Sequence, residues 1–312
     1  KKAFANTNTT SVMKILLTGC KGQVGWEVNR QAPAYDFDVV AKDSSALDIT
    51  DIAAIRALVA ETTPTIIINC AAYTAVDKAE TDEAAAYAVN ALGVQNLGVV
   101  AAEHAIPVLH ISTDYIFDGN TTTAYQENDK PAPTGAYGRT KLAGEQLLAQ
   151  ANPQFITLRT SWVFGIEGNN FVKTMLRIGA ANDEISVVAD QFGCPTFAGH
   201  IARALLDLTK QYQQKGELPW GTYHFCDAGI TTWHMFATTI MAIAEDVGVL
   251  QKAPKVKPIL TQDYPTAAAR PTYSVMDTSA FTTGFPTLTI NSWHAALREM
   301  IQAIHDNKAN GN

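Results

Sequence analysis

The segment KILLTGCKGQVG, residues 14–25, begins with a short apolar run and continues with three spaced glycines. Gly19, Gly22 and Gly25 follow the pattern G-x-x-G-x-x-G, and a stretch with helical spacing starts at Gln23. Glycine permits a tight turn between a strand and a helix, and it lets the backbone approach a pyrophosphate at the helix N-terminus. This order therefore predicts a dinucleotide-binding loop, with a plain strand–helix turn as the alternative for the glycines alone.

The first half of the chain repeats this alternation of strand and helix. After Lys14–Thr18, the apolar runs expected as strands are Phe37–Ala41, Thr65–Cys70, Pro107–Ser112 and Phe155–Arg159. The stretches expected as helices between them are Ile52–Glu61, Asp82–His104 and Lys141–Gln150. Because the strands are apolar throughout, we expect a parallel sheet that is covered on both faces. The predicted fold class is α/β, a doubly wound parallel Rossmann sheet with a smaller mixed α/β lobe.

The rhythm changes beyond residue 165, where helices mix with short strands and prolines punctuate a loop-rich region. We expect residues 13–165 to form the dinucleotide-binding domain and residues 166–312 to form a smaller substrate-binding lobe. The segment near 198–215 is expected to pack back on the first domain. Residues 1–12, KKAFANTNTTSV, are polar and have no hydrophobic signal core, so they are interpreted as a disordered leader or an expression remnant.

Composition excludes several classes of protein. The chain has 312 residues, with 23 Lys+Arg against 30 Asp+Glu and a net charge of −7, which argues against binding to nucleic acid. Its four cysteines, Cys20, Cys70, Cys194 and Cys226, lack zinc-site spacing and lie far apart, so no disulfide framework is expected. By inspection, no apolar run approaches the ~20 residues of a membrane span. We therefore expect a cytoplasmic protein without a membrane partner.

An acidic residue after the second strand would bind the adenosine ribose of a dinucleotide. Asp43 lies at this point, at about the expected ~20 residues beyond the glycine loop. A carboxylate there favours NAD, whereas Lys42 beside it and Lys21 in the loop could accommodate the 2′-phosphate of NADP. The choice between NADH and NADPH stays open, and a solvated turn residue is the alternative for Asp43.

Two further segments are expected beside the cofactor. Asp48 and Ile49 form a loop acid next to an apolar side chain, which suits a position under the adenine. Ala71, Ala72 and Tyr73 follow the third strand, where small residues let the backbone pass close to a dinucleotide.

Tyr137 and Lys141 form the pattern Y-x-x-x-K. Spacing i, i+4 puts both side chains on one face of a helix. A free tyrosine has a pKa of ~10, and a nearby ammonium favours its phenolate, so this pair is a candidate proton donor with its activating group. The alternative is a surface tyrosine beside a snorkelling lysine.

Thr113 and Asp114 close the fourth strand, at the edge where doubly wound sheets bind ligands. A hydroxyl there can polarise a substrate carbonyl, although a strand-end turn is the plainer interpretation. Asn90 lies mid-helix, where asparagine is unfavourable. It is predicted either to hold a relay water, to hold the helix against the active site, or to be simply exposed.

The chain also resembles the extended short-chain dehydrogenase/reductase superfamily and, within it, the dTDP-4-dehydrorhamnose reductase family. The resemblance rests on ordered blocks that run from Met13 to the end. These blocks are GQVGWE, AAYTAVDKAE, STDYIFDG, YGRTKLAGE, RTSWVFG, GNNFVKTMLR, DQFGCPT and YPTAAARP. It implies reduction of the 4-keto group of dTDP-4-dehydro-6-deoxy-L-mannose by NADPH or NADH, giving dTDP-L-rhamnose.

The resemblance also implies roles for particular residues. Those implied to bind the cofactor are Gly22, Gln23, Val24, Asp43, Asp48, Ile49, Ala72, Tyr73, Thr74, Tyr137 and Lys141. Thr113, Asp114, Tyr137 and Trp162 would contact the sugar nucleotide, with Tyr137 donating the proton. An indole at Trp162 can form a flat wall for a sugar ring, with ordinary core packing as the alternative.

The second lobe is expected to hold the nucleotide. Arg270 is a candidate pyrophosphate clamp, with an exposed loop arginine as the alternative. The block DQFGCPT is expected to shape the cleft between the lobes. Some members of the family bind magnesium at a subunit interface, so a homodimer and a magnesium ligand at Glu27 are candidates, but one carboxylate is too little to predict a metal site.

Two rival functions remain. A related epimerase or 4,6-dehydratase is the nearer one, but resembling dehydratases have Thr-Asp-Glu where this chain has Thr113-Asp114-Tyr115. The other is a non-catalytic, cofactor-binding regulatory subunit, against which the intact Thr113, Tyr137 and Lys141 argue. Cys70 stands where the family more usually has alanine, a swap of one small residue for another.

Overall fold

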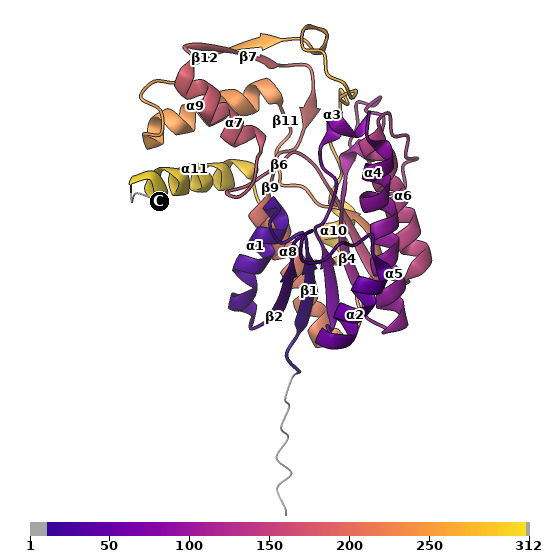
Figure 1. Ribbon diagram of the computed structural model, residues 1–312. Helices are drawn as coiled ribbons and strands as arrows, with labels where there is room; N and C mark the ends of the chain where they lie inside the picture. Colours follow the sequence, from indigo (N-terminus) through magenta and orange to yellow (C-terminus); the bar gives the residue numbers. More distant parts are fainter. Residues whose placement is uncertain (1–10, 310–312) are drawn as a thin grey trace, which may run out of the picture.

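The computed structural model describes residues 11–309. A six-stranded sheet forms its centre, with helices packed around it (Figure 1). The sheet has the order β10-β5-β4-β3-β1-β2, and all its strand pairs are parallel. The strands are β1 (Lys14–Thr18), β2 (Asp38–Lys42), β3 (Ile66–Asn69), β4 (Val108–Thr113), β5 (Phe155–Thr160) and β10 (Gly221–His224). The first five match the expected runs to within one residue at each end, which confirms the doubly wound parallel sheet.

Helices cover both faces of this sheet. On one face lie α1 (Gln23–Gln31) and α8 (Ala198–Lys215), which pack against the buried side chains of Ile15 and Leu17. On the other lie α2 (Ile52–Thr62), α5 (Val94–Glu103) and α6 (Ala136–Ala151), which pack against Leu16 and Ile67. Consecutive strand residues therefore enter opposite cores, and this explains why the strands are apolar throughout.

The sheet takes some of its parts from beyond residue 165. The sixth strand, β10, pairs with β5, and α10 (Ser279–Gly284) packs beside it. Helix α8 packs along α1. The strand β10 reads GTYH, and only His224 in it is buried, so it lacks the apolar run by which the other strands were found. The chain thus crosses between the two lobes several times.

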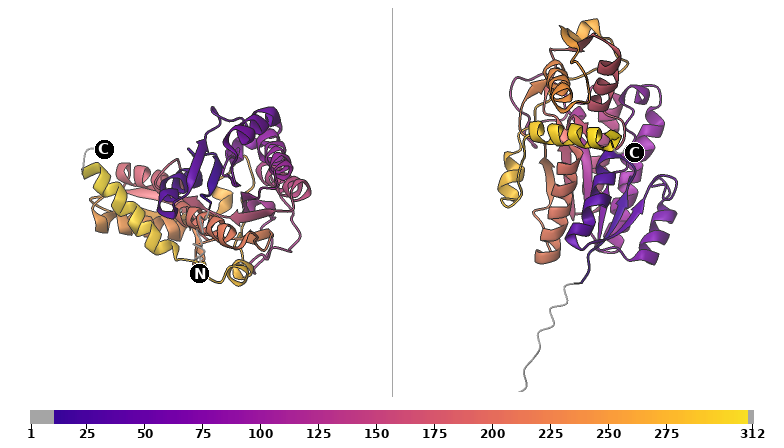
Figure 2. Two further views of the ribbon diagram at one scale, coloured as in Figure 1. Left: turned by 90° about the horizontal axis from the view of Figure 1, so that it is seen from below. Right: turned by 90° about the vertical axis from the view of Figure 1, so that its left-hand side faces the viewer.

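The second lobe has its own hydrophobic core, and its helices pack beside one another (Figure 2). Its helices are α7 (Phe171–Ala181), α9 (Trp233–Val247) and α11 (Trp293–Ala309). Its paired strands are β7 (Glu184–Val188) with β12 (Lys255–Ile259), β8 (Phe192–Gly193) with β11 (Thr231–Thr232), and β6 (Val163–Phe164) with β9 (Thr196–Phe197). Short helical turns within residues 11–309 include η1 (Ala32–Tyr35), α3 (Val76–Ala79), η3 (Asp114–Ile116) and η4 (Thr261–Asp263).

One helical stretch corrects an expectation from sequence. The predicted helix at 82–104 is α4 (Glu83–Tyr87), a π-helical turn η2 (Ala88–Gly93) and α5 in succession. By length and composition alone, residues 83–103 could span a membrane. The expectation that no apolar run approaches the length of a membrane span is therefore wrong. Half of the apolar window is buried inside the fold, where α5 packs against α6, as in the core helix of a globular domain. Residues 1–10 of the expected leader lie outside the described residues.

Candidate active site

A cavity of about 1070 Å³ opens at the carboxyl ends of the strands. Residues that follow β1, β2, β3, β4 and β5 all line it, and the order of the strands reverses between β1 and β3 at this edge. Doubly wound sheets bind their ligands in this crevice. The predicted site residues that line it are Gly19, Gly22, Gln23, Val24, Asp43, Asp48, Ile49, Ala71, Ala72, Tyr73, Thr74, Thr113, Asp114, Tyr137, Lys141 and Trp162.

The glycine loop has the shape that a phosphate cradle needs. Gly19 has φ +69°, and a Cβ there would lie 2.5 Å from the backbone nitrogen of Ala71. Gly25 does not line the cavity; a Cβ on it would lie 2.0 Å from the carbonyl oxygen of Gly19, so it allows α1 to start directly against the loop. Helix α1 has no side-chain cap, so the N–H groups of its first turn are available to an anion. These residues fit a dinucleotide pyrophosphate.

Asp43 is an ionised carboxylate at the end of β2. It forms an ion pair with Lys21, and its Oδ1 accepts hydrogen bonds from the backbone nitrogens of Ser45 (3.1 Å) and Ala46 (3.0 Å). Hydrogen bonds from Lys21 and Ser45 hold the pKa of this carboxyl well below its usual range. Lys21 lines the cavity and Lys42 does not, so Lys21 is the cation beside the expected ribose position.

Asn90 links the third strand to the helix of the Y-x-x-x-K pair. Its amide accepts from the backbone nitrogen of Tyr73 (2.8 Å) and donates to the carbonyl of Tyr73 (3.0 Å) and to the hydroxyl of Thr140 (3.1 Å). It is fully buried within η2, so the exposed alternative is wrong. Of the functional alternatives, this geometry favours holding the helix against the site.

Tyr137 and Lys141 lie in the first two turns of α6. Nζ of Lys141 donates to the carbonyl oxygen of Ile111 at 2.6 Å, and burial lowers the pKa of this lysine to about 8 against the opposing charge of Glu145. Burial raises the pKa of Tyr137, Asp114 raises it further, and a hydrogen bond with Thr113 lowers it.

Thr113 and Asp114 lie close to Tyr137 at the end of β4. Both are buried, and Oγ1 of Thr113 is 3.1 Å from Oδ1 of Asp114. Burial raises the pKa of Asp114 to about 7. The ring of Tyr115 meets the ring of Tyr137 edge-on, with centroids 5.5 Å apart. The proton-bearing groups of the site therefore form one contiguous cluster.

Trp162 lines the cavity in an unusual backbone conformation, with φ +49°. Its indole stacks on Trp233 with centroids 3.6 Å apart and an interplanar angle of 10°. Gly193 also lies against this indole, and a Cβ on Gly193 would be 2.4 Å from the ring. The side chain is both packed and cavity-lining. Gly193 lies in the block DQFGCPT, but no sequence signal pointed to Trp233.

Arg270 does not line the cavity. Its Nη2 pairs with Asp77 at 2.8 Å, and its Nη1 donates to the carbonyl oxygen of Ala268 at 3.1 Å. Asp77 also accepts from the backbone nitrogen of Ala268 at 3.0 Å. Asp77 thus anchors the YPTAAARP block to α3, a role that sequence reasoning missed. Among the described residues beyond 165, only Gly168 and Asn169 line the cavity.

Glu27 uses one of its two carboxylate oxygens within its own helix. It is buried, and its Oε2 accepts from Arg30 at 2.6 Å and from Gln31 at 3.0 Å. Within residues 11–309, no group of three or more His, Cys, Asp or Glu residues could hold a metal ion. Magnesium at Glu27 therefore gains no support. All four cysteines are free thiols.

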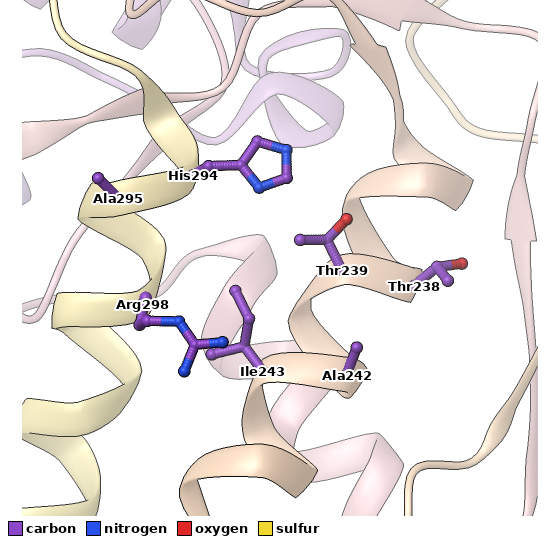
Figure 3. A pocket seen from close by; sticks show the side chains of 7 residues that line it. All are labelled: Thr238, Thr239, Ala242, Ile243, His294, Ala295 and Arg298. Carbon is purple, nitrogen blue, oxygen red and sulfur yellow. The ribbon is translucent and has the colours of Figure 1, made fainter.

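A second hollow lies between α9 and α11 (Figure 3). It is smaller, about 450 Å³, and its lining includes Thr238, Thr239, His294 and Arg298. Arg298 pairs with Asp246 at 2.7 Å. None of the residues predicted for the site lines this hollow, so the chemistry is assigned to the cavity at the strand ends.

Comparison with known proteins gives a consistent result. The family model described as RmlD substrate binding domain matches residues 13–305. A dTDP-4-dehydrorhamnose reductase of Aggregatibacter actinomycetemcomitans is 40% identical over 288 residues, which are 92% of this chain and 98% of that protein.

Two solved structures are also similar. The crystal structure of a dTDP-4-dehydrorhamnose reductase from Clostridium acetobutylicum has a TM-score of 0.86 and 38% identity, covering 94% of this chain and 100% of that one. A Bacillus anthracis dTDP-4-dehydrorhamnose reductase in complex with NADP has a TM-score of 0.84 and 36% identity, covering 93% and 99%.

Proposed function

This chain belongs to the RmlD substrate binding domain family, the family of the dTDP-4-dehydrorhamnose reductases, and from that premise we propose its reaction. It reduces the 4-keto group of dTDP-4-dehydro-6-deoxy-L-mannose with a nicotinamide cofactor and forms dTDP-L-rhamnose. The observation that carries the proposal is the convergence of Tyr137, Lys141 and Thr113 on the cavity that the glycine loop opens. Of these groups, Tyr137 is the proton donor.

The cofactor fits the residues at the strand ends. The first turn of α1 and Gly22 would hold the pyrophosphate, and Asp43 would accept from an adenosine ribose hydroxyl. Because Lys21 stands against Asp43, it would meet a 2′-phosphate if NADPH binds. We propose that both NADPH and NADH are used, through the two halves of this ion pair. A bound reduced nicotinamide supplies the hydride.

The phenol of Tyr137 is in the correct protonation state for a donor. Burial raises its pKa, so the resting group keeps its proton at neutral pH. The alkoxide that develops on the substrate oxygen is a much stronger base, and it takes the phenolic proton in the transition state. Thr113 lies beside the phenol and lowers its pKa. Lys141 keeps its charge beside the Ile111 carbonyl, where a cofactor ribose hydroxyl could also reach it.

The sugar nucleotide is proposed to lie between the two lobes. The indole of Trp162, which lines the cavity and is held by the stacked Trp233, offers an apolar wall for a sugar ring. Arg270 is held by Asp77 and would approach the pyrophosphate. We propose that residues 13–165 mainly bind the cofactor and residues 166–312 mainly bind the substrate, with α8 packed back on the first unit. A homodimer and a cytoplasmic location remain part of this proposal.

The dehydratase alternative is disfavoured by the chemistry of Tyr115. In that alternative, a carboxylate at this position would act as acid and base. Burial raises the pKa of Tyr115 to about 12, so it does not act as a base at neutral pH. A UDP-glucose 4-epimerase of Thermus thermophilus shares the fold, with a TM-score of 0.74, but at 19% identity it indicates nothing further.

The proposed reaction is tested by following the absorbance of reduced nicotinamide with dTDP-4-dehydro-6-deoxy-L-mannose, using NADH and NADPH in parallel. We expect oxidation that depends on the sugar nucleotide. If protein that binds both cofactors oxidised neither, the reductase would be rejected, and the epimerase and regulatory-subunit alternatives would be examined next.

A further inference from the structure

Asp114 is a buried carboxyl group without a cation among the described residues. It is 3% exposed, and its Oδ2 has no hydrogen-bond partner within residues 11–309. The titratable groups that face it are Tyr115, Tyr137 on α6, Cys194 after β8 and Cys226 after β10. Burial raises the pKa of each of these four groups, so all are neutral near pH 7. A carboxylate here would therefore be unpaired.

Because no cation faces Asp114 among the described residues, its protonated form is favoured over its carboxylate. A buried, unpaired carboxylate is strongly disfavoured, so the group retains a proton that an exposed aspartate would lose. Burial raises the pKa of Asp114 to about 7, against hydrogen bonds from Thr113 and Ser274 that lower it. The site thus stores a proton close to the phenol that must donate one.

The hydroxyl of Thr113 joins this carboxyl to Tyr137. Its Oγ1 accepts from the backbone nitrogen of Tyr115 at 3.2 Å and lies 3.1 Å from Oδ1 of Asp114, and the same hydroxyl lowers the pKa of the Tyr137 phenol beside it. A hydroxyl has one hydrogen and two lone pairs. With one lone pair used by the backbone, one donor and one acceptor remain for two partners. The hydroxyl can accept from Asp114 and donate to Tyr137, or the reverse.

We propose that Asp114 is the proton reservoir of the active site, which re-protonates Tyr137 through Thr113. The proposal rests on the proposed reductase function. In that reaction, C4 of the substrate gains the hydride that the reduced nicotinamide supplies, and the carbonyl oxygen takes the phenolic proton. The Tyr137 phenolate takes the hydroxyl proton of Thr113, while Thr113 takes the carboxyl proton of Asp114.

This sequence of transfers balances. Tyr137 and Thr113 regain their starting forms, Asp114 becomes a carboxylate, and a proton from solvent restores it after the product leaves through the open cavity. Each ketone consumes one hydride and one proton, and no further oxidant or reductant is needed. The direction is favourable because a carboxylic acid is a stronger acid than a phenol in the same buried cluster. A residue that only bound the sugar would need none of these transfers.

The first test is Asp114→Asn, which keeps the shape of the side chain but removes its titratable proton. We expect kcat to fall at least about tenfold, within the range of general acid–base contributions, while KM and the Kd for NADPH change little. The pH profile of kcat should lose its limb near pH 7, and small carboxylic acids should partly restore the turnover of Asp114→Ala. The matched control is Asp118→Asn, a carboxylate farther along the same loop that does not line the cavity, which should leave kcat unchanged.

A raised KM with an unchanged kcat and pH profile would overturn the proposal and leave Asp114 as a sugar ligand only. If the variants fail to fold, an infrared titration of the wild-type protein tests the proposal instead. Its infrared spectrum should contain the carbonyl band of a buried carboxylic acid that disappears as the pH rises through about 7, and a spectrum without such a band would reject the reservoir. Because this titration needs no substrate, it can fail or succeed independently of the reductase assay.

Discussion

The α-carbon of Gly193 lies against the indole of Trp162, so closely that a Cβ would be 2.4 Å from the ring. On the same indole stacks Trp233, with centroids 3.6 Å apart. Trp162 itself has φ +49°, a conformation that is uncommon for a bulky residue. The wall of the cavity is therefore held in place by its neighbours, and strain of this kind is typical of functional sites.

Gly193→Ala should displace this indole. We expect an increase of about tenfold in KM for the sugar nucleotide, equivalent to about 1.4 kcal/mol, with the Kd for NADPH unchanged. Trp162→Ala should have a similar or larger effect on KM or kcat. Substrate kinetics together with fluorescence titration of the cofactor would separate the two effects. A change in thermal stability alone, with normal kinetics, would show that Trp162 only packs.

Tyr137→Phe should remove turnover and keep cofactor binding. The phenylalanine preserves the ring contact with Tyr115 and removes only the hydroxyl, so kcat should fall by about 10²–10⁴-fold. Single-turnover kinetics and cofactor titration are the measurements. As a control, Tyr87→Phe alters an exposed tyrosine on α4 and should be neutral. If Tyr137→Phe matched the parent in kcat, another group would be the proton donor.

Asp43→Ala should weaken the binding of NADH more than the binding of NADPH. The carboxylate is interpreted as the partner of the adenosine ribose hydroxyl, so its removal takes away a charge-assisted hydrogen bond that NADH needs. Without Asp43, Lys21 is released from its ion pair and can serve a 2′-phosphate. Dissociation constants for both cofactors are the measurement, with Lys42→Ala as a comparison outside the cavity. Equal losses for NADH and NADPH would contradict the assignment.

Much of this architecture follows from local sequence. The apolar runs of β1 and β3 are strands because residues such as Leu16 and Leu17 enter opposite cores, and the glycine loop is dictated by the contacts of Gly19 and Gly25. The strand β10 could not be found in this way, because its pairing with β5 is determined by tertiary contacts.

Side-chain partners were harder to predict than positions. The spacing of Tyr137 and Lys141 predicts one helix face correctly, but not that Nζ of Lys141 would turn to the carbonyl of Ile111. Likewise, nothing local pairs Asp77 with Arg270, which is 193 residues away in the chain. Long-range polar contacts of this kind depend on the assembled fold.

The pH dependence of the free energy of unfolding should show that the buried His224 is neutral in the folded protein. Nη1 of Arg159 lies 3.3 Å from its Nε2, and its Nδ1 lies 3.0 Å from the carbonyl oxygen of Tyr125. Since guanidinium only donates and a carbonyl only accepts, Nε2 must be the acceptor and Nδ1 the protonated nitrogen. Protonation of Nε2 would set an N–H against the guanidinium. Burial lowers the pKa of His224 from 6.5 to about 4, and the positive charge of Arg159 is the second cause of this shift.

A lowered histidine pKa means that the unfolded chain binds the proton first. The contribution of neutral His224 to stability is therefore complete above about pH 6.5 and is lost as the pH falls toward about 4, by roughly 3 kcal/mol in total. His224→Gln keeps a donor and an acceptor but does not titrate. In urea unfolding, the difference in free energy between the parent and this variant should be constant from about pH 7 to 8. Between pH 6.5 and about 4, the parent should lose stability relative to the variant. A difference that stayed constant across that range would show that His224 is not held neutral.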